Sequence, residues 1–78
     1  MPAVLVTEGF RFFFFSNEGT EPPHIHVEQG DGYAKFWLDP VELAYSVAMK
    51  QHELKRARLL VMQHAPNFKE RWNGYFGT

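Results

Sequence analysis

The sequence predicts an α+β domain, in which a small antiparallel β-sheet of four or five strands, joined by hairpins, is followed by two C-terminal helices packed on one face. In the first two-thirds of the chain, short β-branched and aromatic segments lie between turns that contain Gly or Pro. In the last third, the apolar residues change to helical spacing. Strands followed by helices, without alternation, are typical of α+β domains. With 78 residues, the chain is expected to form a single domain, 1–78.

The first two expected strands form a hairpin. Residues 3–6 are short, apolar and rich in β-branched residues, and residues 10–15 are mostly Phe. A two-residue loop at 8–9 would place Leu5 opposite Phe12.

A second hairpin follows a polar loop that ends in two prolines. Residues 24–28 alternate in polarity, a Gly-rich turn comes next, and residues 33–38 alternate again. A two-residue loop at Gly30-Asp31 brings the two apolar faces together, whereas a one-residue slip would turn apolar side chains outward. This register pairs His24 with Trp37, Ile25 with Phe36, His26 with Lys35, Val27 with Ala34 and Glu28 with Tyr33.

The segment Val41–Val47 has two interpretations. Its alternation of apolar residues predicts an edge strand, while Glu42-Leu43-Ala44 also suits a helical turn. We prefer the strand.

Two helices are expected after about Gln51. The first has apolar residues at helical spacing. Pro66 suits the first turn of the second, because the N–H that proline lacks would have no partner there. Gly77 is expected to end that helix. The two apolar stripes consist of Leu54, Ala57, Val61 and Ala65, and of Phe68, Trp72, Tyr75 and Phe76.

Composition excludes several classes of protein. The chain has no cysteine, which excludes disulfides and thiolate zinc sites. Its net charge of -1 gives no overall field that would attract nucleic acid or membranes. It has neither a signal-peptide pattern nor an apolar run long enough to span a bilayer. We therefore expect a soluble, cytoplasmic protein that does not bind membranes.

The aromatic segment 10–15 is apolar on both sides of its expected strand. Phe10, Phe12 and Phe14 would share one face, and Phe13 and Phe15 the other. Because two helices cover only one face of so small a sheet, the second face predicts an interface with another chain. The alternative is that the proline loop folds over it.

His24 and His26 point to the same side of their expected strand, about 6.5–7 Å apart at Cα. Two imidazoles at this spacing can bind one metal ion, such as Zn²⁺ or Ni²⁺. A third ligand is easiest to supply from the preceding loop, by Asn17, Glu18 or Glu21, and we name Glu18. The alternative is a solvated sheet face without a function.

The same face also suggests acid–base catalysis. The pKa of histidine lies near neutrality, and a lysine opposite it would favour the neutral ring. His24 or His26 with Lys35, beside Tyr33 and Glu28, resembles the residues of metal-independent ribonucleases. In this hypothesis His24, His26 and Lys35 are catalytic.

Basic residues gather at the start of the first expected helix. They are Lys50, His52, Lys55, Arg56 and Arg58. Such clusters are usually solvated helix faces, and a weak contact with phosphate is the alternative.

The stretch FFFFSNEGTEPPHIHVEQGDGYAKFWLDPVELAYS resembles a family of short bacterial proteins catalogued as domain of unknown function 4160. An aromatic strand leads through a polar loop into Pro-Pro-His-x-His, then a Gly turn, an aromatic strand, a helix and a late Trp. The matching residues are Pro22, Pro23, His24, His26, Gly30, Trp37 and Trp72. Members often carry His or Asp in the loop before the prolines, where this chain has Asn17 and Glu18, and this departure weakens the metal hypothesis.

The resemblance implies one component of a two-gene, toxin–antitoxin-like cassette. Our leading hypothesis is that the chain binds a partner protein, either a cognate small protein or a second copy, or RNA, through one sheet face. A hydrolytic enzyme, metal-dependent or of the histidine-based ribonuclease kind, and a purely structural interaction domain are the alternatives. Besides the two histidines, the expected binding face consists of Arg11, Glu28, Tyr33, Lys35 and Trp37.

Overall fold

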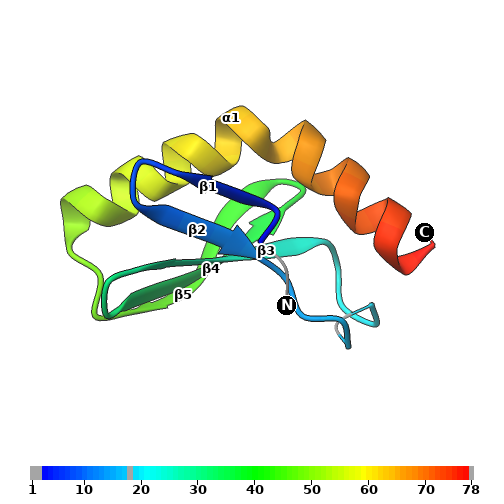
Figure 1. The fold of residues 1–78 in the computed structure, drawn as a ribbon, viewed down its shortest axis with the longest axis horizontal. Coiled ribbons are helices and arrows are strands. Elements are labelled where there is room, and N and C mark those ends of the chain that lie inside the picture. The colour runs from blue at the N-terminus through cyan, green and yellow to red at the C-terminus, as the bar shows by residue number, and fades with distance from the viewer. Residues whose placement is uncertain (1–2, 18, 78) are drawn as a thin grey trace.

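The structure is a computed structural model, which describes residues 3–17 and 19–77. Five antiparallel strands follow one another in the sheet in chain order, and one long helix lies across one face of that sheet (Figure 1). The α+β class is therefore confirmed. The elements are β1 (Leu5–Thr7), β2 (Phe10–Phe13), β3 (His24–Gln29), β4 (Gly32–Leu38), β5 (Val41–Val47) and α1 (Gln51–Phe76).

The predicted strand register is confirmed. Leu5 lies opposite Phe12, and all five residue pairs expected between β3 and β4 are present. The segment Val41–Val47 is a strand, as preferred, and it pairs with β4. The pairing of β4 with β5 shifts by one residue, because Lys35 pairs with Tyr45 and the next residue, Phe36, pairs with Leu43. Ala44 is left between them as a bulge.

The prediction of two C-terminal helices is wrong, because α1 is one helix of 26 residues with Pro66 inside it. Proline lacks the N–H that would bond to the carbonyl of Met62, so it removes one helical hydrogen bond. On either side of it, Ala65, Phe68 and Trp72 remain buried against the sheet. Continuous burial of this face offsets the lost bond, and the helix axis changes direction near its middle (Figure 1).

The hydrophobic core lies between α1 and the side of the sheet that faces it. Phe10, Phe12 and Phe14 are buried there, as their alternation predicted. The helix contributes the buried residues Ala57, Leu60, Val61, Ala65, Phe68 and Trp72. Among the described residues, no helical segment has the length and apolar character required to cross a membrane.

α1 leaves most of the opposite side of the sheet uncovered, and we call that side the open face. Cross-strand partners point to the same side of a sheet, so the register identifies its residues. They are Val6, Arg11, Phe13, His24, His26, Glu28, Tyr33, Lys35, Trp37, Glu42, Tyr45 and Val47.

Candidate functional site: two histidines within an aromatic cluster

His24 and His26 lie on the open face, but they are not at the surface. Their exposed fractions are 0% and 3%. The alternative of a solvated sheet face therefore does not describe these two rings. Strand alternation correctly gives the direction of each side chain, but aromatic rings from other segments close over both of them.

His26 lies between aromatic rings on the open face. Its ring stacks on Phe13, with 5.4 Å between centroids, and on Tyr33, with 5.7 Å. The ring of Phe15 approaches to 4.9 Å. The Nδ1 atom of His26 is hydrogen-bonded to the Tyr33 hydroxyl at 2.5 Å, and that hydroxyl lies 3.3 Å from the hydroxyl of Tyr45. A polar chain therefore runs from the buried imidazole to an exposed tyrosine.

His24 connects the proline loop to the C-terminal half of α1. Its Nδ1–H donates a hydrogen bond of 2.9 Å to the carbonyl oxygen of Pro22. A carbonyl can only accept, so Nδ1 carries the proton of this bond. The ring centroid lies 4.7 Å from Trp72 and 5.6 Å from Trp37. Trp72 reaches it from the helix, which explains how a residue of the open face is fully buried.

The cations of the open face are held by acids and aromatic rings. Arg11 forms an ion pair with Glu28 at 3.1 Å, and its guanidinium lies 4.7 Å from the centroid of Phe13. Lys35 lies opposite His26 in the register, as predicted. Its ammonium forms an ion pair with Glu21 at 2.8 Å. It also lies over the ring of Trp37, 4.5 Å from the centroid, in a cation–π contact.

The described residues do not complete a metal site. Within residues 3–17 and 19–77, no three His, Asp or Glu side chains are placed to hold an ion together. Glu18, the predicted third ligand, lies outside the described residues. Two imidazoles are fewer than the four ligands of a structural zinc site. The metal hypothesis stays a prediction, and its test is whether Zn²⁺ or Ni²⁺ raises the Tm of the wild type but not of His24→Ala/His26→Ala.

The catalytic hypothesis needs His24, His26 and Lys35 to act on one substrate. The two histidine rings do lie close together, with centroids 5.0 Å apart. However, both rings are buried, and the Lys35 ammonium contacts Glu21 and Trp37. An RNA phosphate would have to displace these contacts to reach the imidazoles. The geometry favours a role for the histidines in organising the face, and catalysis stays a prediction.

The sequence indicated some members of this cluster and missed others. It identified Tyr33 and Trp37 by register and Phe13 and Phe15 by alternation. It missed Tyr45 as a hydrogen-bond partner of Tyr33, and Trp72 as a cover for His24. Trp72 gave a signal as part of an apolar helical stripe and as the late Trp of the family pattern, but neither signal placed it against His24.

Comparison with known proteins gives a single result. The family model described as "Domain of unknown function (DUF4160)" matches residues 9–73, which include β2 to β5 and most of α1. The match contains Pro22, Pro23, His24 and His26, on which the resemblance rested. The comparisons found no matching curated protein and no matching solved structure.

Proposed function

Because the chain belongs to the family described as a domain of unknown function (DUF4160), whose description names no activity, we propose its function from the geometry of the site. In this proposal the chain is the protein-binding component of a toxin–antitoxin-like bacterial pair. It binds its partner through the open face of the sheet.

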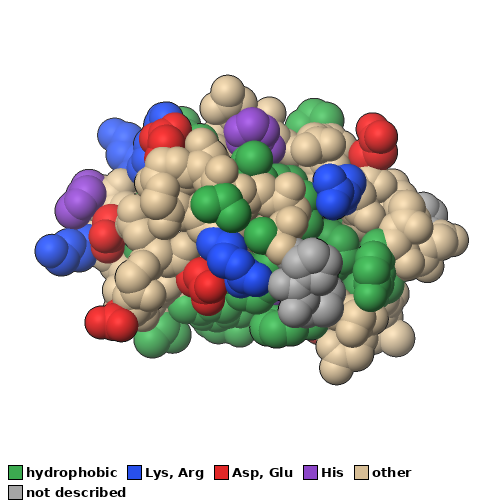
Figure 2. Space-filling model, in the orientation of Figure 1, with side chains coloured by type: hydrophobic (Ala, Val, Ile, Leu, Met, Phe, Trp, Pro, Cys, Tyr) green, Lys and Arg blue, Asp and Glu red, His purple; other side chains and the backbone are tan. Residues whose placement is uncertain are grey.

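Exposed apolar side chains on the open face are the observation that carries the proposal. Val6, Phe15, Tyr45 and Val47 are 65%, 42%, 50% and 58% exposed. Phe15 follows β2 and joins this face through its contacts with Phe13 and His26. In Figure 2, hydrophobic side chains gather along the lower border of the view, on the side away from α1. These four side chains share one face of the sheet, and exposed apolar side chains gathered on one face are a feature of protein interfaces.

The charges favour a protein partner over RNA. Arg11 and Lys35 are paired with Glu28 and Glu21, so the open face offers little uncompensated positive charge. The view in Figure 2 shows acidic and basic side chains interspersed, without a broad region of one sign. Binding to a nucleic-acid backbone depends on cations that neutralise phosphates. Aromatic and apolar side chains, in contrast, are enriched at the centres of protein interfaces.

In this function the two histidines hold the binding surface in shape. His26 is stacked between Phe13 and Tyr33, and His24 joins Pro22 to Trp72. A face whose rings are already fixed loses less side-chain entropy when a partner binds.

Co-expression with the product of the adjacent gene tests the proposal. The tagged wild-type chain is expected to co-purify with that product in a defined ratio. The change Phe15→Glu/Tyr45→Glu places two charges on the open face and should abolish the complex while the chain stays folded. The control Leu59→Glu/Met62→Glu places the same charges on exposed apolar positions of α1 and should leave it intact.

Two outcomes would contradict the proposal. One is an equal yield of complex from the wild type and the open-face variant. The other is RNA cleavage by the purified wild-type chain without the partner, which would support the hydrolytic alternative.

A further inference from the structure

A second surface, the outer edge of β5, is suited to pair with another strand. β5 has seven residues and ends the sheet, and within the described part of the chain no strand lies on its outer side. The opposite edge is β1, which has only three residues. An edge strand presents unpaired backbone N–H and C=O groups, and a long one offers more of them to a new partner.

Of the usual devices that protect an edge, β5 has a bulge and lacks the others. Natural edge strands are commonly blocked by lysine, proline or inward-pointing charge. The strand Val41–Val47 has no basic residue and no proline, and its single charged residue is Glu42. Leu43, Tyr45 and Val47 are all exposed. Only the bulge at Ala44 interrupts its pairing with β4.

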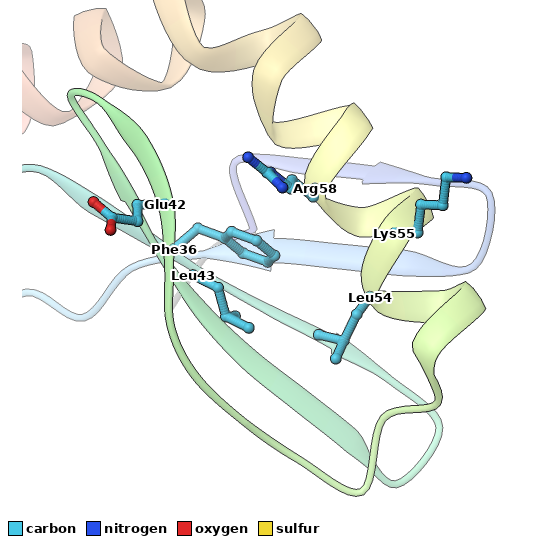
Figure 3. A pocket seen from close by; sticks show the side chains of 6 residues that line it. All are labelled: Phe36, Glu42, Leu43, Leu54, Lys55 and Arg58. Atoms are coloured by element: carbon cyan, nitrogen blue, oxygen red, sulfur yellow. The ribbon is translucent and has the colours of Figure 1, made fainter.

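A pocket of about 380 Å³ opens beside this edge, between β5 and α1. Its apolar part consists of the buried ring of Phe36 and the side chains of Leu43 and Leu54. Leu43 extends from β5 and Leu54 from α1, each toward the other (Figure 3). This volume is sufficient for one or two side chains of a bound segment.

The charge around the pocket is positive. Lys55 and Arg58 line it from α1, and Glu42 is the one acid in its lining (Figure 3). Among the described residues, the ion pairs of the chain involve Arg11, Lys35 and Arg56, and none involves Lys55 or Arg58. An acidic group bound here would complement two cations that have no carboxylate partner in the described structure.

We propose that β5 binds an extended, acidic segment of a second protein as a sixth strand of the sheet. The backbone of that segment would pair with the outer edge of β5. On the side facing α1, an apolar side chain would enter the pocket against Phe36, Leu43 and Leu54. An acidic side chain on the same side would contact Lys55 and Arg58.

The same charges argue against a second copy of this chain as the occupant. Two copies that pair antiparallel through β5 are related by a two-fold axis perpendicular to the sheet, which keeps both helices on one side. The Lys55 and Arg58 side chains of both copies would then line the same seam. Four cations would repel one another there, whereas an acidic segment would be attracted.

Titration of the labelled protein with peptides, followed by NMR, tests the inference. The probe acetyl-Ser-Leu-Thr-Glu-Thr-Leu-Ser-amide carries Leu and Glu on one face, and a matched probe has Lys in place of Glu. The acidic probe should shift the β5 amides saturably and bind about tenfold more tightly than the Lys probe, a difference of about 1.4 kcal/mol. Lys55→Gln/Arg58→Gln should remove this preference, whereas Lys69→Gln/Arg71→Gln, with the same charge change elsewhere on α1, should keep it.

Several results would overturn the inference. They are no saturable shift in β5, equal binding of both probes, or concentration-dependent shifts of β5 without peptide that strengthen in Lys55→Gln/Arg58→Gln. The last result would identify a second copy as the occupant. The inference goes beyond the proposed function, since Phe15→Glu disrupts the open face but should leave the peptide titration unchanged.

Discussion

His26 illustrates how a polar residue is accommodated inside an aromatic cluster. Burying an imidazole is costly unless its nitrogens are hydrogen-bonded. Tyr33 supplies a partner for Nδ1, and the stacked rings of Phe13 and Tyr33 supply close contacts on both faces. His26 therefore stabilises the open face through packing and one strong polar contact.

Replacing His26 should test this structural role. His26→Ala is expected to lower the free energy of unfolding by about 1–3 kcal/mol, because it removes the ring stack and leaves the Tyr33 hydroxyl without this partner. Tyr45→Phe is the control, because it removes an exposed hydroxyl from the same polar chain and should change stability by about 0.5 kcal/mol or less. Urea denaturation measures both. Equal stability of wild type and His26→Ala would show that the ring contributes nothing to the fold.

Gly32 is the residue at which the β3–β4 turn has no room for a side chain. A Cβ there would lie 2.9 Å from the carbonyl oxygen of Ala48 and 3.2 Å from that of Gln29. Gly32→Ala should therefore destabilise the protein by about 1–3 kcal/mol, since backbone must move to relieve the contact. Gly74→Ala makes the same change within α1, in open space, and should stabilise by up to about 1 kcal/mol. Thermal melts that move in the same direction would contradict the argument.

At the scale of elements, an exposed ion pair joins the β1–β2 turn to α1. Two guanidinium nitrogens of Arg56, Nε and Nη2, donate to the carboxylate of Glu8, at 2.7 Å and 2.5 Å. The hydrogen bonds from Arg56 are the largest influence and lower the pKa of Glu8 below its usual range. Desolvation of the carboxylate opposes this, and the charge of Arg56 adds to the lowering. Glu8 and Arg56 lie 48 positions apart, so the pair links two segments that are distant in the sequence.

The sign of the pH dependence follows from this lowered pKa. The ion pair between Glu8 and Arg56 contributes its full stabilisation above the pKa that Glu8 has in the unfolded chain. This stabilisation is lost as the pH falls through the lower pKa that Glu8 has in the folded protein. Arg56→Gln should raise the pKa of Glu8 toward its ordinary value of about 4.3. Arg58→Gln removes a nearby charge without touching Glu8 and is the control. A carboxyl NMR titration with identical pKa values for Glu8 in all three proteins would show that the pair does not form.

The strands were predictable because local signals agreed with one another. Turns rich in Gly fixed the loop lengths, and the alternation in β3 and β4 allowed a single register that buries both apolar faces. The helix was divided wrongly because Pro66 has two interpretations in a sequence: it can begin a helix or interrupt one. Only the packing of Ala65, Phe68 and Trp72 on one sheet decides between them.

Pro66 should therefore limit the stability of α1. Pro66→Ala restores the N–H donor to the Met62 carbonyl. Proline costs about 3 kcal/mol in a helix interior, but it also restricts the unfolded chain by about 0.4–1 kcal/mol, so we expect a net gain of about 2–2.6 kcal/mol. Gln63→Ala, at an exposed position of the same helix, should change stability by only a few tenths. A loss of stability in Pro66→Ala would mean that the change of helix direction is required for packing on the sheet.

At the scale of the whole molecule, the burial of the two histidines could not be predicted from the strand that carries them. The alternation of β3 gives the face on which a side chain lies, but not what covers that face. His24 is covered by Trp72, 48 positions away, and His26 by rings from β2 and β4. Such contacts depend on where α1 ends relative to the sheet, which no local pattern encodes. The strand pattern therefore gave the face on which the two histidines lie but not their burial.

The open face predicts how the isolated protein behaves in solution. Without its partner, the exposed side chains Phe15, Tyr45 and Val47 remain in water, so we expect the wild-type chain to self-associate as its concentration rises. Because the cations of this face are paired, the association should be driven by apolar burial. It should then weaken on cooling and persist in moderate salt, unlike binding through charge. Light scattering should show a dimer or larger species for the wild type and a monomer for Phe15→Glu/Tyr45→Glu, while Leu59→Glu/Met62→Glu behaves as the wild type. A wild-type chain that stays monomeric at high concentration, or an association abolished by salt, would show that the apolar residues of the open face do not drive binding.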